Sequence, residues 1–212
     1  MRIYAVADIH GKQAKIARIR QVISELKPDA LVVAGDITAY VNSGAVIHQF
    51  NQMPVPVLAI RGNTDIKKVD RLLDVYPNTS SLHLKEQKMN GVKFVGVSGT
   101  IPVPFSSRIG WREKKIINTL ATLIDNNAVL VVHSPPRGVL DEAFGRFHAG
   151  CRRLYQLIVQ RQPKLVLCGH IHESPGIATI GQTTVVNCNV ARTGRGVVVD
   201  FEPDGSFRVN ML

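Results

Sequence analysis

The chain has 212 residues, of which 45% are hydrophobic and 20% are charged, a composition typical of a globular protein rather than a disordered one. The formal net charge of +10 indicates an anionic partner, such as a phosphate ester, a nucleic acid or an acidic surface. Three scattered cysteines form no CxxC pair, which excludes a disulfide framework and predicts buried thiols at Cys151, Cys168 and Cys188.

The sequence contains no segment typical of a membrane or secreted protein. No apolar stretch reaches the roughly 18 residues that suggest a membrane span. The residues after Met1 read directly into a strand, which leaves no room for a cleavable signal, so we expect a cytoplasmic protein. Because no repeat, low-complexity segment or linker is visible, residues 1–212 are expected to form a single domain.

The first half of the chain alternates strand patterns with helix patterns. Three β-branched apolar runs have strand length: Ile3–Ala7, Ala30–Ala34 and Val55–Ile60. Three helices are predicted to follow them: Gln13–Leu26, Ser43–Gln52 and Lys67–Asp74. Pro28 stops the first of these helices. Strands that alternate with helices favour a parallel sheet.

The second half changes character and adds hairpins. The Asn90-Gly91 pair predicts a hairpin between Ser81–Lys85 and Val92–Ser98. The long Ser134–Ala149 segment, rich in Pro and Gly, is expected to be a functional surface loop. The other predicted elements are a loop at Ile101–Gly110, helices at Arg112–Ile124 and Cys151–Arg161, strands at Ala128–Val132 and Leu165–Cys168, and antiparallel strands at Gly176–Ile180, Thr183–Asn187, Gly196–Phe201 and Phe207–Val209. This order predicts an α/β fold in which two sheets pack together with helices outside.

Five polar motifs each follow one of the apolar strand runs. They are Asp8-Ile9-His10, Gly35-Asp36, Gly62-Asn63, His133 and Gly169-His170-Ile171-His172. The carboxyl ends of parallel strands meet at one edge of an open sheet, so these side chains should come together there. Singly, each motif has an ordinary interpretation as a turn or a half-buried histidine, but the ordered set predicts a site for two divalent metals.

The residue types suggest how the metals are shared. Alternation puts Asp8 and His10 on one side of an extended segment, where both can hold the same ion. Asp36 has two oxygens with which to bridge two ions, and Asn63 adds a neutral oxygen. The other ligands are His172 for the first ion, and His133 and His170 for the second. Mixed nitrogen and oxygen ligands without a thiolate suit manganese, iron, nickel or zinc and do not choose among them. Manganese is taken as the expected metal.

The ordered motifs resemble those of the calcineurin-like metallophosphoesterase superfamily over about residues 1–190. Residues 133–138 and 168–173 are most similar to the small bacterial and archaeal phosphoesterases and their metazoan relatives. The resemblance implies a four-layer α/β/β/α sandwich with two mixed β-sheets flanked by helices. It also implies metal one at Asp8, His10, Asp36 and His172, and metal two at Asp36, Asn63, His133 and His170. The implied reaction is phosphate ester hydrolysis by a metal-bound hydroxide, without a covalent enzyme intermediate.

The sequence departs from the superfamily pattern at Thr64, where many members have a histidine. That histidine is usually credited with protonating or stabilising the leaving oxygen, and a threonine has no pKa near neutrality. We therefore expect phosphodiesters or activated phosphoesters to be favoured over alkyl phosphomonoesters. Asn187-Cys188-Asn189 also departs from the usual Asn-Pro-Gly, which makes the local loop geometry there harder to predict.

Three residues are assigned to catalysis, and several alternatives stay open. Asn63, a proposed metal ligand, is the first of these catalytic residues. Arg61 is expected to contact the substrate phosphate, and His148 could replace the missing acid. His48 and His83 are expected to be surface or core residues. The expected partner is a small phosphate ester or a nucleotide, and the sequence does not predict the oligomeric state. The alternatives are a nuclease, which the positive charge encourages, and a non-catalytic metal-binding scaffold, which Thr64 favours.

Overall fold

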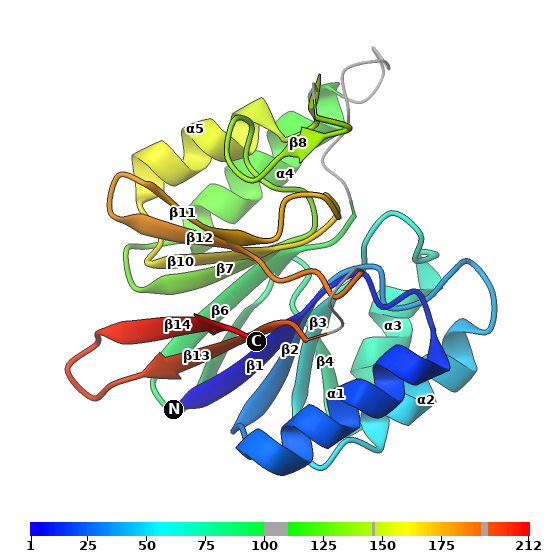
Figure 1. Cartoon of the computed structure of the whole chain (residues 1–212). Coiled ribbons are helices and arrows are strands. Elements are labelled where there is room, and N and C mark those ends of the chain that lie inside the picture. Colours follow the sequence, from blue (N-terminus) through cyan, green and yellow to red (C-terminus); the bar gives the residue numbers. More distant parts are fainter. Residues whose placement is uncertain (100–109, 146, 192–194) are drawn as a thin grey trace.

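The computed structural model describes residues 1–99, 110–145, 147–191 and 195–212. The predicted loop at Ile101–Gly110 therefore falls outside the described residues, except for Gly110. Two six-stranded sheets pack face to face, and helices cover both outer faces (Figure 1). The predicted four-layer α/β/β/α sandwich with two mixed sheets is confirmed.

The first sheet has the strand order β14-β13-β1-β2-β3-β4. Its strands are β1 (Arg2–Val6), β2 (Ala30–Ala34), β3 (Val57–Ile60), β4 (Thr79–Ser81), β13 (Val197–Phe201) and β14 (Phe207–Met211). The four strands from β1 to β4 are parallel, and β13 pairs antiparallel with β1. Parallel strands present their carboxyl ends at one edge, as the motifs require.

The second sheet has the strand order β11-β12-β10-β7-β6-β5. Its strands are β5 (Glu86–Met89), β6 (Val92–Val97), β7 (Ala128–Val132), β10 (Leu165–Cys168), β11 (Gly176–Ile180) and β12 (Thr183–Asn187). The inner strands β12, β10, β7 and β6 are parallel, and both edge strands are antiparallel to their neighbours. A short separate hairpin pairs β8 (Glu142–Ala143) with β9 (Phe147–His148) inside the predicted long loop.

Helices cover the outer face of each sheet (Figure 1). Those over the first sheet are α1 (Gln13–Leu26), α2 (Ser43–Asn51) and α3 (Lys68–Val75), and those over the second are α4 (Gly110–Leu123) and α5 (Arg152–Arg161). Helix α1 buries Ile16, Ile19 and Ile23 against the sheet, which is the stripe that its apolar spacing predicts. Besides the apolar layers under the helices, another apolar layer lies between the two sheets and includes Phe94, Val131 and Leu167.

Backbone hydrogen bonds join the two sheets at their carboxyl ends. The Ala7 N–H donates to the Cys188 carbonyl at 3.1 Å, and the Val190 N–H donates to the Ala7 carbonyl at 2.9 Å. The Gly99 N–H donates to the Arg61 carbonyl at 2.8 Å. These bonds hold the ends of both sheets at one place, directly beside the polar motifs.

The predicted hairpin is wrong in its first strand. The Asn90-Gly91 turn joins β5 to β6 with Met89 opposite Val92, because a two-residue turn requires the pairing strand to end directly before it. Residues 81–85 instead carry the chain from the first sheet to the second. The Leu82 N–H donates to the Ala59 carbonyl of β3, and the Leu82 carbonyl accepts the Gly96 N–H of β6. The true partner strand, Glu86–Met89, is polar because it is an edge strand, so its sequence lacks a strand-like apolar pattern.

Two further expectations can be compared with the structure. Cys151, Cys168 and Cys188 are all buried and none of the three forms a disulfide, so the prediction of buried thiols is confirmed. Within the described residues, no helix is both long and apolar enough to cross a bilayer.

We predict that Gly96→Ala destabilises the protein by about 1–3 kcal/mol, because a new methyl group would overpack the space between the sheets. A Cβ at this position would lie 2.7 Å from Cγ2 of Ile60 and 2.8 Å from Cβ of Leu82. Denaturant unfolding measures the change. Gly44→Ala is the matched control, since a Cβ at Gly44 in helix α2 would have no other described residue within 4 Å beyond its chain neighbours and its own helix backbone and should not reduce stability. Equal effects of both substitutions would contradict the packing argument.

Candidate metal centre

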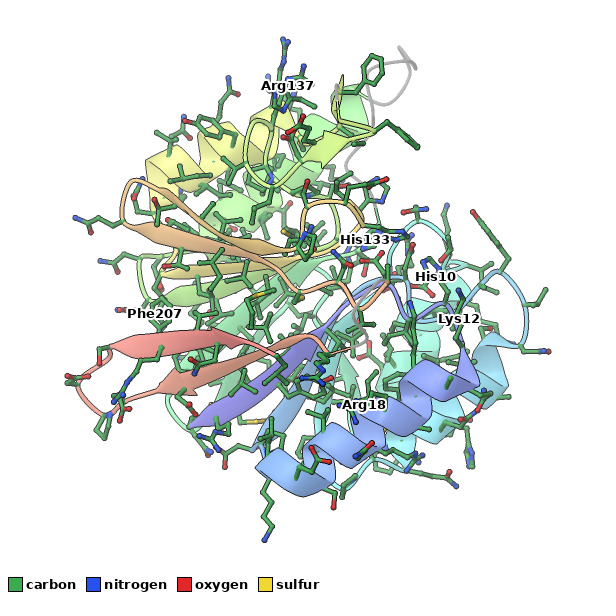
Figure 2. The ribbon with its side chains drawn as sticks, in the orientation of Figure 1. His10, Lys12, Arg18, His133, Arg137 and Phe207 are labelled. Carbon is green, nitrogen blue, oxygen red and sulfur yellow. The ribbon has the colours of Figure 1, made fainter. Side chains whose placement is uncertain are left out.

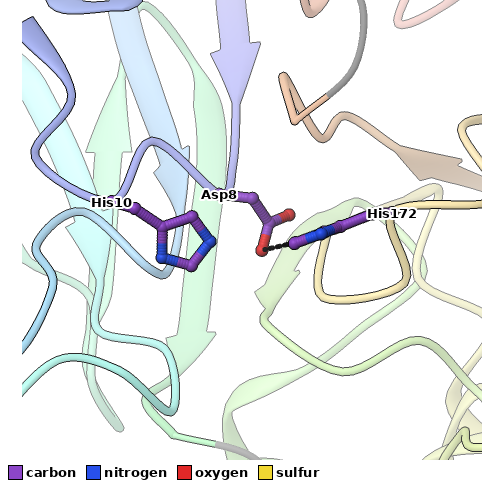
Figure 3. Close-up of side chains that lie close together, drawn as sticks. All are labelled: Asp8, His10 and His172. Atoms are coloured by element: carbon purple, nitrogen blue, oxygen red, sulfur yellow. Dashed lines mark ion pairs between the residues drawn. The ribbon is translucent and has the colours of Figure 1, made fainter.

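Asp8 lies at the end of β1 and is completely buried. Its Oδ2 atom accepts the His170 N–H at 2.9 Å. Its Oδ1 atom receives no hydrogen bond from the described part of the chain and lies 3.3 Å from Nε2 of His172 (Figure 3). The backbone is left-handed, with φ of 63°, and the Asp8 carbonyl accepts from the Lys15 ammonium at 2.6 Å. A buried carboxylate oxygen without a donor is costly unless a cation compensates it.

His10 and His172 approach Asp8 from opposite sides (Figure 3). Their ring centroids are 5.7 Å apart, and the three side chains place one ligand atom each within 4.8 Å of one another. Burial lowers the pKa of His10, which favours the neutral imidazole that metals bind. The neighbouring Asp8 carboxylate raises the pKa of His172.

Thr64 orients His10. The Thr64 hydroxyl donates to the Thr38 carbonyl at 2.8 Å, so its oxygen can accept the Nδ1–H of His10 at 3.3 Å. That arrangement leaves Nε2 of His10 available to an ion. The residue that replaces the family histidine is therefore held in the network that surrounds the carboxylates.

Asp36 follows β2 and lies between the two groups of histidines. Its Oδ2 atom is 3.9 Å from Nδ1 of His10, and its Oδ1 atom is 3.4 Å from Nε2 of His133. Oδ1 also accepts the Thr64 N–H at 2.9 Å. Burial alone would raise the pKa of Asp36, but His133 and this N–H hold it at about 2. The carboxylate is therefore ionised and faces both sides of the site.

His133 is fully buried at the end of β7. Its Nδ1 atom lies 2.8 Å from the Ala34 carbonyl, which fixes the proton on that nitrogen and directs Nε2 into the site. Nε2 is 3.0 Å from Oδ1 of Asn63, and the ring centroid is 5.0 Å from that of His170. Burial, followed by the proximity of His133, lowers the pKa of His170 to about 4.

The seven predicted ligand positions therefore come together at one place, where the carboxyl ends of the two sheets meet. Figure 2 labels two of them, His10 and His133. Asp8, Asp36 and His133 form a second group whose ligand atoms lie within 4.8 Å of one another. Two buried carboxylates, four imidazoles and an amide oxygen form a donor set that suits divalent cations. The unsatisfied Oδ1 of Asp8 gives independent support for a cation there.

Arg61 lies at the edge of this group and is held by its neighbours. Its Nε atom donates to Oδ2 of Asp70 at 2.8 Å, and the Ser98 hydroxyl donates to the other oxygen of Asp70 at 2.6 Å. This pairing uses one edge of the guanidinium and orients the rest of it. The predicted contact with a substrate phosphate is not tested by this geometry and stays a prediction.

His148 is not part of this cluster. It lies on strand β9, where its Nδ1 atom is 2.8 Å from the buried carboxylate of Asp141. Its carbonyl accepts from Arg137, which Figure 2 shows far from His10. Among the described residues, no recorded hydrogen bond, ion pair or ring contact joins His148 to the seven positions. Its role as an acid therefore has no supporting contact.

The sequence analysis missed the structural role of Asn187 and Asn189. Both are buried, and their side-chain amides donate to the Ile171 carbonyl at 2.8 and 3.2 Å. Ile171 separates His170 from His172, so the two amides fix the loop that carries both histidines. The departure from Asn-Pro-Gly marked these positions, but only the fold shows which carbonyl they reach.

A hollow of about 610 Å³ lies away from this cluster. Its lining includes Met1, Lys27 and Asp29, which sit before the amino ends of β1 and β2. Arg2 and Asp200 in its wall pair with each other at 2.7 Å. The polar groups with metal-binding character are therefore at the other end of the strands.

Comparisons with known proteins agree with this geometry. A family model described as calcineurin-like phosphoesterase matches residues 1–174. An uncharacterised protein of Methanocaldococcus jannaschii is 31% identical over 198 residues, which cover 88% of this chain and 87% of that protein. Metallophosphoesterase domain-containing protein 1 of Homo sapiens is 41% identical over 77 residues, or 35% of this chain and 22% of that protein. A dimetal phosphatase from Danio rerio has the same fold, with a TM-score of 0.65, 11% identity and coverage of 94% and 92%.

We predict that Mn²⁺ stabilises the wild-type protein against heat and that Asp8→Asn removes most of this effect. At one hundred times Kd, one ion contributes about 2.7 kcal/mol, which corresponds to a Tm increase of about 5–10 °C for a domain of this size. Asp8→Asn keeps the shape but removes the buried charge. Thermal scans with and without metal measure the difference. Asp125→Asn, on the surface, should keep the full response, and an unchanged response in Asp8→Asn would contradict the assignment.

We also predict that Asn189→Ala weakens Mn²⁺ binding by about tenfold to a hundredfold, as expected when a group that orients a ligand is lost. Titration calorimetry measures the affinity. Asn78→Ala is the matched control, because the Asn78 amide also donates to two backbone carbonyls in partly buried hydrogen bonds, those of Met53 and Val55, outside the cluster. It should lower stability without lowering metal affinity. Equal affinity loss in both variants would indicate a general folding effect.

Proposed function

Because this chain belongs to the calcineurin-like phosphoesterase family, we propose that it is a dinuclear-metal phosphoesterase that hydrolyses phosphodiesters or activated phosphoesters. The observation that carries this proposal is the position of Asp36, whose two oxygens face histidines on opposite sides. A carboxylate placed in this way can serve two ions. The expected substrate is a small phosphate ester or a nucleotide.

We assign two ions to the seven residues. The proposed ligands are Asp8, His10, Asp36 and His172 for one ion, and Asp36, Asn63, His133 and His170 for the other. When bound, two divalent ions supply positive charge that binds phosphoryl oxygens and lowers the pKa of water. Manganese is the proposed metal, and iron, nickel and zinc suit the same donors.

The protein groups around the ions act by orientation and charge. The Ala34 carbonyl holds the ring of His133, and the Ile171 carbonyl is held by two amides, so the ligands are set before substrate binds. Asp70 orients Arg61, and we propose that the remaining N–H groups of Arg61 contact a phosphate oxygen. The positive net charge of the chain favours association with an anionic substrate.

Thr64 determines which leaving groups the site can release. Its hydroxyl is used by Thr38 and His10, and it cannot supply a proton near neutral pH. Esters whose leaving groups need no proton should therefore react best. His148, paired with Asp141, stays a secondary proposal for the acid, to be tested by comparing the pH–rate profiles of His148→Ala and wild type.

The alternative supported by Thr64 is a metal-binding scaffold without activity. Two bound ions without turnover of an aryl phosphodiester would distinguish this scaffold from an enzyme. A nuclease is not favoured by any further observation in the described residues, and DNA binding with a steep salt dependence would be its signature.

We predict that Thr64→His raises turnover of alkyl phosphate esters by about a hundredfold or more, the contribution typical of a general acid. Aryl esters should change little, because their leaving groups depart without a proton. The measurement is kcat/KM with Mn²⁺ on matched alkyl and aryl esters, in both mono- and diester form. Wild-type protein that hydrolyses alkyl monoesters as fast as matched diesters would contradict the proposed preference.

A further inference from the structure

The segment after Asp36 holds an exposed aromatic residue in an unfavourable backbone conformation. Tyr40 and Asn42 are both left-handed, each with φ of 55°. Residues other than glycine rarely adopt this backbone conformation, and residues with bulky side chains adopt it less often than asparagine does. The Tyr40 side chain is 63% exposed and that of Val41 is 68% exposed. Backbone strain at an exposed residue supports a binding role where the residue also lies beside a polar site.

Hydrogen bonds connect this segment to the metal centre. The Tyr40 N–H donates to the Thr64 carbonyl at 3.0 Å. The Thr64 N–H in turn donates to Oδ1 of Asp36, and its hydroxyl lies 3.3 Å from Nδ1 of His10. Only Thr64 therefore stands between the backbone of Tyr40 and two proposed metal ligands, so the tyrosine side chain starts at the rim of the centre.

The surface around Thr64 is apolar as well as exposed. Ile66, two residues further along the chain, is 39% exposed. Tyr40, Val41 and Ile66 thus present three large apolar side chains from two segments that a hydrogen bond joins. We name these three residues the apolar rim. Large exposed apolar groups beside a polar site usually mark a binding surface.

We propose that the apolar rim binds a planar aromatic group of the substrate, with Tyr40 as the stacking surface. This inference rests on the proposed function, because it requires the phosphate to sit at the metal centre. An ester bound there must extend its organic part over the rim of the site. Aromatic rings prefer to stack on or against another ring, which makes Tyr40 the residue that determines specificity. The substrate class is then an aromatic phosphate ester, consistent with the loss of the acid at Thr64.

The test is direct binding of two inert anions to the Mn²⁺-loaded protein by titration calorimetry. Phenylphosphonate and methylphosphonate carry the same anionic group on a stable carbon–phosphorus bond and differ in the ring. Wild type should bind phenylphosphonate more tightly. Tyr40→Ala should weaken phenylphosphonate binding by about threefold to tenfold, the range expected for an aromatic pair, and leave methylphosphonate unchanged.

Three variants separate stacking from other effects. Tyr40→Phe keeps the ring and should keep the preference, whereas Tyr40→Leu keeps bulk without a ring and should lose most of it. Phe144→Ala is the control, because Phe144 is 83% exposed on the β8–β9 hairpin, outside the apolar rim. It should have no effect.

The outcomes distinguish this inference from the proposal on which it rests. Binding of both anions with the same preference in wild type and Tyr40→Ala overturns the role of Tyr40 alone. Equal losses for both anions in Tyr40→Ala also overturn it, because they indicate a disturbed metal centre. Failure of wild type to bind either anion overturns the proposed function, and the inference with it.

Discussion

Two buried carboxylates, Asp8 and Asp36, impose the constraint on which the site depends. Removing a charge from water is costly, so each carboxylate needs hydrogen bonds or opposite charges. Backbone N–H groups of His170 and Thr64 supply one bond each, and histidines approach the other sides. Oδ1 of Asp8 receives no hydrogen bond from the described residues and lies 3.3 Å from Nε2 of His172. A divalent cation beside it would complete the network.

The glycines of the motifs allow the two sheets to approach closely enough for this network. Gly35 has φ of 93°, and a Cβ there would lie 2.5 Å from Nδ1 of His133. A Cβ on Gly169 would lie 2.6 Å from Oδ2 of Asp8. The missing side chains therefore make room for neighbouring ligands from the other sheet.

The convergence of the seven proposed ligand positions was predictable because each of their motifs follows an apolar strand, and parallel strands end at one edge. The first strand of the β5–β6 hairpin was not predictable, because the edge strand Glu86–Met89 has the sequence EQKM and so lacks an apolar run. The contacts of Asn187 and Asn189 with Ile171 depend on how β10 and β12 lie beside each other, which no local pattern encodes. His148 could not be placed because the short hairpin that carries it lies within a long loop.

The central claim is that Asp36 joins two ions in one site. Anomalous diffraction from crystals of the Mn²⁺-loaded protein tests it most directly. The account predicts two peaks per chain, one beside His10 and His172 and the other beside His133 and His170, with oxygens of Asp36 in contact with both. A single peak, or two peaks of which one has no contact with Asp36, would contradict it.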